Sequence, residues 1–295
     1  MAQNLIDLRR RIKSVKDTQK TTKAMKTVSA AKLRRSVSEV NRNRPILDKI
    51  DSILLQSEKV CHMNNHPFLQ ERKEGHTVVV VVSADKGLCG AFNSRLISKT
   101  ESHFKQLIET ESYTPYLITV GNKATRYFSK RKFEIKKMYP GIMTRLKYEN
   151  AYELSQYLQK IYLSQTDEIK KIEFIFTEFV SAGKQEVNFK SLFPITHRCD
   201  DTNENDTKDI EYIYEPSAEA IFKYLLPRYI DSTIFQILLQ SSASEHAARM
   251  VAMDLATKNA SEMIRTLTLT MNKMRQASIT KELLEIITAT EALKK

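Results

Sequence analysis

The sequence predicts an α/β protein with two parts: a long antiparallel coiled coil of the N- and C-terminal helices, and a central Rossmann-like α/β domain. Three observations predict this fold class. Residues 1–44 and residues 228–295 contain neither glycine nor proline, so each segment can form an uninterrupted helix. Apolar residues recur in both segments at intervals of three and four. Between the two segments, β-branched runs alternate with helical patterns.

The length of the terminal helices limits how they can be buried. At about 1.5 Å per residue, a helix over residues 1–44 reaches roughly 65 Å and one over residues 228–295 roughly 100 Å. An ordinary domain cannot bury helices of that length, so we expect them to pack on each other or on another protein. The expected division is an amino-terminal coiled-coil helix (1–60), the α/β domain (61–215) and a carboxyl-terminal coiled-coil helix (216–295).

The amino-terminal segment is typical of one strand of a coiled coil. Its apolar seam starts at Leu5, becomes polar at Gln19 and Thr22, and continues afterwards in a different phase, which predicts a stutter. Pro45 should kink this helix or start a second segment. The apolar members of the expected seam are Leu5, Leu8, Ile12, Val15, Met25, Val28, Leu33, Val37 and Val40.

The middle of the chain reads as a mostly parallel sheet that ends in a hairpin. The run of five valines in residues 76–82 indicates a strand buried on both faces. A glycine-bearing turn then leads into a helix. The expected strands are 76–82, 116–120, 133–138, 172–180, 185–193 and 210–214, and the expected helices are 93–109, 122–132 and 149–163.

The carboxyl-terminal segment has a second seam, whose members are often small or sulfur-containing. Methionine tolerates changing neighbours, so this seam either slides against a partner or packs in the ordinary way on the first helix. Leu283, Leu284, Ile286 and Ile287 make the far end apolar, and we expect something to cover it. The seam comprises Met250, Met253, Thr257, Ala260, Ile264, Leu267, Met271 and Met274.

Positive charge is concentrated in the first helix. Residues 1–44 carry 13 Lys and Arg against 3 Asp and Glu, whereas residues 45–216 carry 24 of each and residues 217–295 carry 10 against 8. Such a helix seeks nucleic acid, an anionic membrane surface or an acidic protein face; the plainer alternative is a solvated surface. The sequence has no run of eighteen apolar residues and no signal-peptide pattern, so we expect the chain in the cytosol or on a cytosolic surface.

The sequence predicts no active site, metal or cofactor. Cys61, His62, His66, His197 and Cys199 do not have zinc-finger spacing, and scattered residues are the better interpretation. Gly87 to Gly90 invites a phosphate-loop interpretation, but Lys86 precedes the glycines instead of following them. Cys89 lies at a helix start, yet no histidine is near it in sequence, so we do not expect a nucleophile.

Four stretches of the sequence stand out as motifs: TTKAMKTVSAAKL (21–33), SADKGLCG (83–90), SEHAARMVAM (244–253) and RQASITKEL (275–283). Together they resemble the signatures of one known family, the gamma subunits of F-type ATP synthases. Their order agrees with the family over residues 4–293. The sequence departs from it at Lys86, where arginine is common, and at Lys26, where glutamate is frequent, so local charge pairing at Lys26 differs.

The resemblance implies a non-catalytic central-stalk rotor that couples rotation of a c-ring to ATP synthesis and hydrolysis on the beta subunits. Implied partners are three alpha and three beta subunits, the epsilon subunit and the c-ring, with this chain in single copy and no cofactor. It implies a peripheral place on the cytoplasmic face of a bacterial inner membrane. The residues implied to contact beta subunits are Met25, Lys26, Arg249, Gln276 and Thr280, and those at the epsilon and c-ring end are Tyr212, Tyr214 and Glu215.

Two other functions compete with that interpretation. A basic coiled-coil protein that binds nucleic acid accounts for the charge of residues 1–44 but not for the apolar carboxyl-terminal end, and residues 1–44 contain no aromatic side chain to stack on bases. A nucleotide-dependent enzyme built on the central domain requires a phosphate-binding loop that the sequence does not contain.

Overall fold

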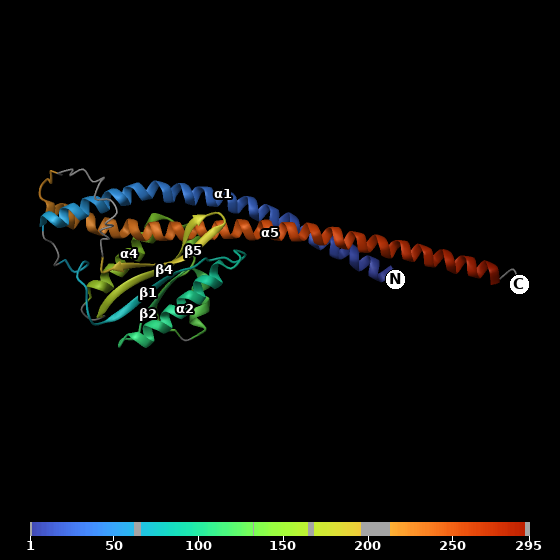
Figure 1. Ribbon diagram of the computed structural model, residues 1–295, viewed down its shortest axis with the longest axis horizontal. Coiled ribbons are helices and arrows are strands. Elements are labelled where there is room, and N and C mark those ends of the chain that lie inside the picture. Colours follow the sequence, from blue (N-terminus) through green and yellow to red (C-terminus); the bar gives the residue numbers. More distant parts are fainter. Residues whose placement is uncertain (1, 62–65, 132, 165–167, 196–212, 293–295) are drawn as a thin grey trace. The chain divides into compact units, whose positions relative to one another are not determined.

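The computed structural model describes residues 2–61, 66–131, 133–164, 168–195 and 213–292 (Figure 1). Contacts divide the chain into two units, one of Met1–Ala30 with Arg249–Lys295 and one of Ala31–Ala248. Helices α1 (Ala2–Cys61) and α5 (Ala218–Ala292) each contribute a part to both units. The predicted fold class is confirmed, while the division at residues 60 and 215 stays a prediction.

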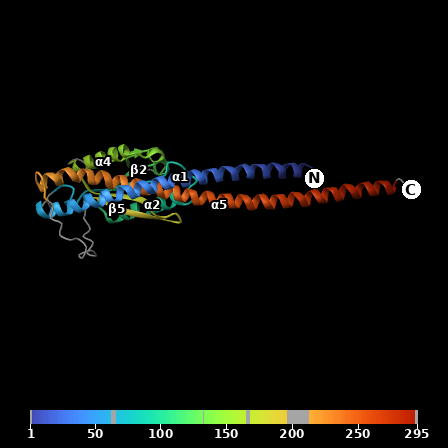
Figure 2. The same ribbon diagram turned by 90° about the horizontal axis from the view of Figure 1, so that it is seen from above.

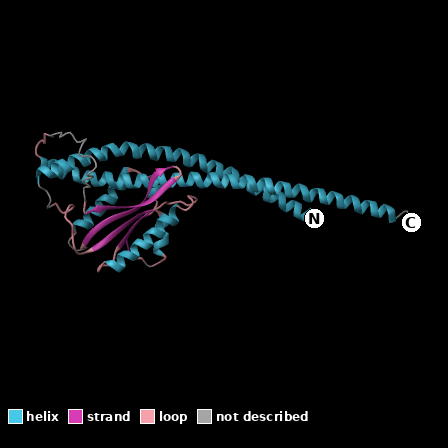
Figure 3. Cartoon of the chain, in the orientation of Figure 1, coloured by secondary structure: helices cyan, strands magenta, loops and turns pink. Residues whose placement is uncertain are grey.

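The second unit contains a five-stranded sheet in the order β3-β2-β1-β4-β5 (Figure 3). β1 pairs in parallel with β2 and β4, β2 pairs in parallel with β3, and only the β4–β5 pair is antiparallel. This is the mostly parallel sheet with a final hairpin that the sequence predicts. The strands are β1 (His76–Val82), β2 (Tyr116–Val120), β3 (Ile135–Tyr139), β4 (Ile169–Ser181) and β5 (Lys184–Phe193).

Helices cover both faces of the sheet, which explains the unbroken valine run of β1. Val79 and Val81 pack with residues of α2 (Phe92–Thr110) and α3 (Asn122–Ser129). Val78, Val80 and Val82 point to the opposite face, where α4 (Tyr148–Leu163) and the first part of α5 contribute to one large core. All five valines are fully buried. Each fully buried side chain of this size contributes about 1.5–3 kcal/mol, so β1 anchors the domain.

Three local predictions differ from the structure. The helix expected over 122–132 ends at Ser129. Of the two outcomes expected at Pro45, a new segment is ruled out because the helix is continuous from Ala2 to Cys61, whereas the kink stays a prediction. Of the strand expected at 210–214, Ile213 and Tyr214 are not in a strand and 210–212 lie outside the described residues. A single 3₁₀ turn, η1 (Ile142–Arg145), follows β3 without a clear sequence signal.

Within each unit, α1 and α5 lie side by side and run in opposite directions (Figures 1 and 2). In the first unit, Gln19 faces Ser261 and Thr22 faces Thr257. In the second unit, the Ser36 and Ser242 hydroxyls are 3.4 Å apart. As the residue number rises on one helix it falls on the other, so the predicted antiparallel pairing is confirmed.

The predicted stutter in α1 is wrong. Val28 is 56% exposed, whereas the neighbouring Ser29 is 3% exposed. The buried or half-buried positions therefore continue in steps of three and four through Ser29 and Ser36, without a change of phase. Small serine side chains take seam positions, and the larger Val28 faces outward. On α5, the predicted seam is confirmed, since Met253 and Ala260 are buried and the other members are half-buried.

Candidate functional site

The paired ends of α1 and α5 form the candidate functional site, and a polar layer crosses the seam there. The hydroxyl oxygens of Thr22 and Thr257 are 2.8 Å apart, and Gln19 Nε2 donates to Ser261 Oγ at 2.7 Å. Each threonine hydroxyl also donates a hydrogen bond to a main-chain carbonyl of its own helix. Thr22 donates to the Gln19 carbonyl at 3.0 Å, and Thr257 donates to the Met253 carbonyl at 2.7 Å. Polar pairs inside a seam favour one alignment of two helices over the others.

One ion pair adjoins this polar layer. Lys26 Nζ donates to Asp254 Oδ1 at 2.6 Å, and Lys258 Nζ lies 3.2 Å from Asp254 Oδ2. The hydrogen bond from Lys26, followed by that from Lys258, lowers the pKa of Asp254 below its ordinary value. Asp254 therefore stays ionised and is shared by both helices. The Lys26 side chain keeps 45% of its surface exposed, so a partner can still reach it.

Three of the five residues expected to contact beta subunits lie close to this ion pair along the helices. Met25 and Lys26 are half-buried, and Arg249 precedes Asp254 by about one and a half turns of α5. Arg249 is only 8% exposed and interacts with other residues of the chain. A partner that uses Arg249 must therefore compete for a side chain that is already engaged.

The other two expected contacts are far along α5. Gln276 and Thr280 are exposed and one turn apart, and Thr280 Oγ1 donates to the Gln276 carbonyl at 3.0 Å. At about 1.5 Å per residue, Gln276 lies roughly 40 Å along the helix from Arg249. The five residues thus form two separate groups, so the surface they mark is a long strip.

An interrupted apolar stripe on α5 accompanies this strip, with the charged Lys258 and Glu262 on the same line between its first two members. Val251, Leu269 and Ile287 are spaced by eighteen residues, which is five full helical turns, so they lie on one line of the helix surface. Their exposed fractions are 47%, 55% and 56%. Gln276 and Thr280 follow Leu269 by two and three turns and lie near the same line. Periods of three and four residues do not reveal this stripe in the sequence, whereas an eighteen-residue apolar period does.

The far end of α5 is apolar and uncovered in the described part of the chain. Leu283, Leu284, Ile286 and Ile287 are all more than half exposed. Because Gln19 faces Ser261 in an antiparallel pair, the described start of α1 is opposite residues near 278. Residues beyond that point have no facing segment among those described. This agrees with the expectation that another protein covers the end.

At the predicted epsilon and c-ring end, only part of the site is described. Tyr212 lies outside the described residues. Tyr214 is half-buried and Glu215 is exposed, and both precede the start of α5 at Ala218. The neighbouring Ile213 is 96% exposed.

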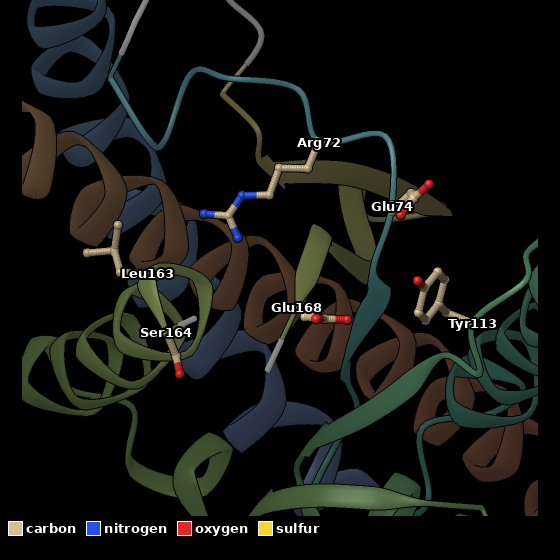
Figure 4. A pocket seen from close by; sticks show the side chains of 6 residues that line it. All are labelled: Arg72, Glu74, Tyr113, Leu163, Ser164 and Glu168. Carbon is tan, nitrogen blue, oxygen red and sulfur yellow. The ribbon is translucent and has the colours of Figure 1, made fainter. Parts of the chain in front are cut away.

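The α/β domain also has a shallow hollow of about 480 Å³ near the amino-terminal ends of β1 and β4 (Figure 4). The Arg72 guanidinium donates to the Ile169 carbonyl at 2.8 Å and lies 4.2 Å from the Tyr162 ring centre, so it serves the fold. No nucleophile lies beside a base among its described lining residues, which are Arg72, Glu74, Tyr113, Leu163, Ser164 and Glu168.

A second basic segment lies within residues 45–216, although that range as a whole has no net charge. Residues 122–147 contain nine lysines and arginines but only one acidic residue. They include β3, which lies at one edge of the sheet. Lys136 Nζ is 4.1 Å from the Tyr116 ring centre and Lys137 Nζ is 4.0 Å from that of Tyr157. Lysines on an edge strand prevent pairing with strands of other chains, which accounts for part of this charge.

Among the described residues, no group of three or more His, Cys, Asp or Glu side chains could hold a metal ion. His66 is described, but His62, His197 and Cys199 lie outside the described residues, so that zinc hypothesis is not tested. Cys89 is buried and accepts a hydrogen bond from Asn93 Nδ2 at 3.1 Å. None of the described helices contains an apolar stretch long enough to cross a membrane.

Comparison with known proteins agrees with the resemblance seen in the sequence. The family described as ATP synthase matches residues 4–293. A protein of Pelotomaculum thermopropionicum named ATP synthase gamma chain is 41% identical over 290 residues, which cover 98% of this chain and 99% of that one. A protein of Desulforamulus reducens with the same name is 39% identical over 287 residues, covering 97% and 98%.

Solved structures share the fold. A chain from the mitochondrial ATP synthase of Euglena gracilis superposes with a TM-score of 0.68 at 18% identity, covering 99% of this chain and 95% of that one. A chain from the central stalk and c-ring of the Tetrahymena thermophila enzyme gives a TM-score of 0.57 at 23% identity, covering 80% and 99%. Together with the near-complete matches in sequence, these findings lead to one conclusion: the chain belongs to the family of ATP synthase gamma chains.

Proposed function

We propose that this chain is the non-catalytic central rotor of a proton-translocating F-type ATP synthase. Its proposed role is to couple rotation of the c-ring to changes in nucleotide affinity on three beta subunits. The observation that best supports this role is the apolar carboxyl-terminal end of α5, where Leu283, Leu284, Ile286 and Ile287 are each more than half exposed. An exposed apolar patch of that kind typically marks a surface that another protein covers.

The coupling follows from asymmetry. A single chain inside a ring of three alpha and three beta subunits cannot present the same surface to each beta subunit. One side of the helix pair carries the α5 stripe, and α1 carries most of the net positive charge of the chain. Each beta subunit is then stabilised in the conformation that the facing side prefers, because only unequal contact shifts a population. Rotation moves this preference from one beta subunit to the next.

Each proposed site residue has a specific partner subunit in this mechanism. Met25 and Lys26 would face an acidic segment of a beta subunit, with Arg249 at the same level. Gln276 and Thr280 would contact beta subunits nearer the apolar end. Tyr212, Tyr214 and Glu215 would contact the epsilon subunit and the c-ring. Ion flow would supply torque at about 2.3 kcal/mol per charge for each 100 mV.

Catalysis would take place on the beta subunits, and this chain would need no cofactor. We propose that it is present in single copy and is held at the cytoplasmic face of the bacterial inner membrane through its partners. Relatives that are 39% and 41% identical over nearly the full length are named ATP synthase gamma chain, which supports the proposed role of this chain as the gamma subunit of such a complex.

Co-purification tests the proposal. A tagged version of this chain is expressed with the alpha and beta subunits of its own source organism, and the mass of the complex is measured by native mass spectrometry. We expect one copy of this chain with three alpha and three beta subunits. A chain that purifies alone, or a complex with several copies, would contradict the proposal.

The competing function, nucleic-acid binding, receives no support from the comparisons. A salt titration separates it from the proposal, because affinity for phosphates falls steeply with ionic strength. Weak binding that disappears at physiological salt is the result expected for a basic helix whose partner is a protein. Tight binding that persists there would favour the nucleic-acid function.

A further inference from the structure

A buried carboxylate lies beyond the carboxyl-terminal ends of the parallel strands. Asp85 follows β1 and is 9% exposed. Its Oδ1 accepts hydrogen bonds from the main-chain N–H groups of Asn122 and Gly141, both at 2.9 Å. Its Oδ2 accepts one from the N–H of Thr144 at 2.7 Å and one from the Thr144 hydroxyl at 2.9 Å. Each carboxylate oxygen thus has two donors.

The four donors come from two different connections, each shaped by a glycine. Gly121 has a φ of +92°, and a Cβ there would lie 2.1 Å from the Ser83 carbonyl oxygen, so only glycine fits. It precedes α3 and leaves the N–H of Asn122 free to point at Asp85. Gly141 has a φ of +83° and begins the turn that leads to Thr144. The chain therefore builds a cradle of donors for a planar anion with two oxygens.

The place of this cradle is informative. In open parallel sheets, ligands bind outside the carboxyl ends of the strands, and their anionic groups accept hydrogen bonds from helix N-termini. Asp85 follows β1, Asn122 follows β2 and Gly141 follows β3. At the carboxyl-terminal ends of the strands, where such a domain could hold the anion of a ligand, this chain supplies the carboxylate of Asp85.

The loop that carries Asp85 also supports α5. Ala84, Cys89 and Phe92 form a small buried cluster with Ala248 packed against it. The Ala84 N–H donates to Asn93 Oδ1 at 3.1 Å, which closes the loop on the first turn of α2. Holding Asp85 in place therefore fixes a loop that contacts α5 directly.

We propose that Asp85 acts as an internal anion that fills an oxyanion site, and that the emptied site binds small carboxylates such as formate. Two donors for each oxygen match a carboxylate in number and arrangement. This inference concerns the α/β domain alone and does not depend on the proposed rotor function.

Chemical rescue of the full-length chain tests the inference. Asp85→Ala removes the carboxylate but keeps the Cβ, leaving room for formate. We expect its melting temperature to fall by roughly 5–10 °C, because four donors lose a charged acceptor. Sodium formate should restore part of this loss along a saturating curve, whereas sodium chloride of equal ionic strength should not.

Two variants serve as controls. Asp85→Asn fills the cradle with a neutral group of the same shape, so it should be destabilised without responding to formate. Asp85→Ala combined with Thr144→Val lacks one donor and should need more formate for the same recovery. If Asp85→Ala does not fold, its refolding yield from urea is compared in formate and in chloride, and equal yields contradict the inference. Equal formate responses of Asp85→Ala and the wild type contradict it as well.

Discussion

Lys26 Nζ lies 2.6 Å from Asp254 Oδ1, which joins α1 to α5 by an ion pair between residues 228 positions apart in the sequence. The residue that the family resemblance assigns to an acidic beta-subunit segment thus already has an acidic partner in its own chain. Because Lys26 remains partly exposed, the two interactions can coexist or exchange. The pair therefore bears on both the stability of the helix pair and the proposed contact.

The first prediction concerns the pH dependence of this pair. Its hydrogen bonds lower the pKa of Asp254 below the ordinary 3.8. A carboxyl group whose folded-state pKa is depressed contributes stability above its unfolded pKa and loses that contribution as the pH falls through the folded pKa. Wild type should therefore be more stable than Asp254→Asn at pH 7; the difference should begin to shrink as the pH falls toward 3.8 and should vanish only below the lower, folded-state pKa.

Thermal unfolding of both proteins between pH 7 and pH 2.5 measures this difference. Asp17→Asn is the matched control, because Asp17 pairs with Lys20 of the same helix at 3.9 Å. Its effect on stability should be smaller at neutral pH. A difference between wild type and Asp254→Asn that grows in acid would contradict the assigned pairing.

The second prediction concerns the hydroxyl pair in the seam. Thr22→Val alone removes one hydroxyl and leaves Thr257 without its partner across the seam, so we expect a loss of about 1 kcal/mol in the free energy of unfolding. Thr22→Val with Thr257→Val replaces both hydroxyls by methyl groups of similar size and should be neutral or stabilising by up to about 1 kcal/mol. Urea denaturation of the three proteins distinguishes these outcomes. Additive losses in the double variant would show that the hydroxyls do not interact.

The third prediction tests the phase of α1. Val28→Asp should change stability by less than about 0.5 kcal/mol, because Val28 faces outward. Ser29→Asp places a carboxylate in the buried seam and should cost about 2 kcal/mol or more. The two variants introduce the same group at adjacent positions, so each controls for the other. A large loss of stability in Val28→Asp together with little loss in Ser29→Asp would contradict the observed phase and support the stutter predicted from the sequence.

The fourth prediction concerns the α5 stripe. Leu269→Ser should leave the stability of the isolated chain within about 0.5 kcal/mol, because the side chain is exposed, but should weaken assembly with alpha and beta subunits. Met263→Ser is the control, since Met263 is equally exposed and lies off the stripe. Competition of each variant with wild type for the purified alpha–beta ring measures the effect. Equal incorporation of both variants would show that the stripe does not contribute to the interface with the alpha and beta subunits.

The fifth prediction concerns Arg249 and Gln276. Each alanine substitution should lower coupled ATPase activity of the reconstituted complex several-fold while the chain still folds. Arg249→Ala should also reduce the stability of the isolated chain, because Arg249 is buried and engaged there. Gln276→Ala should not, because Gln276 is exposed. Asn259→Ala, at another exposed position of α5, controls for general surface effects. Wild-type turnover in both complexes would contradict these site assignments.

Much of the fold could be predicted because its signals are local. Five consecutive valines identified β1, and the absence of glycine and proline identified the long helices. The phase of α1 could not be predicted from apolarity, because Ser29 occupies the seam by its small size while Val28 does not. Helix packing depends on shape as well as hydrophobicity, and shape complementarity is a property of both partners.

The site was predictable only where the family motifs carry it. The motifs placed Lys26 and Arg249, but the partner of Lys26 depends on the register of two helices and has no local signal. The Asp85 cradle was missed for a different reason. Three of its four donors are main-chain N–H groups, which any residue but proline supplies, so no side-chain pattern announces them.

Rotation of the chain inside its complex tests the central claim most directly. The alpha–beta ring is immobilised, and a probe is attached just after α3, at the exposed position 130, through Lys130→Cys in a chain whose Cys61, Cys89 and Cys199 are replaced by alanine. During ATP hydrolysis, we predict rotation in one direction with one stop for each beta subunit. A probe that stays fixed while the complex hydrolyses ATP would contradict the rotor function.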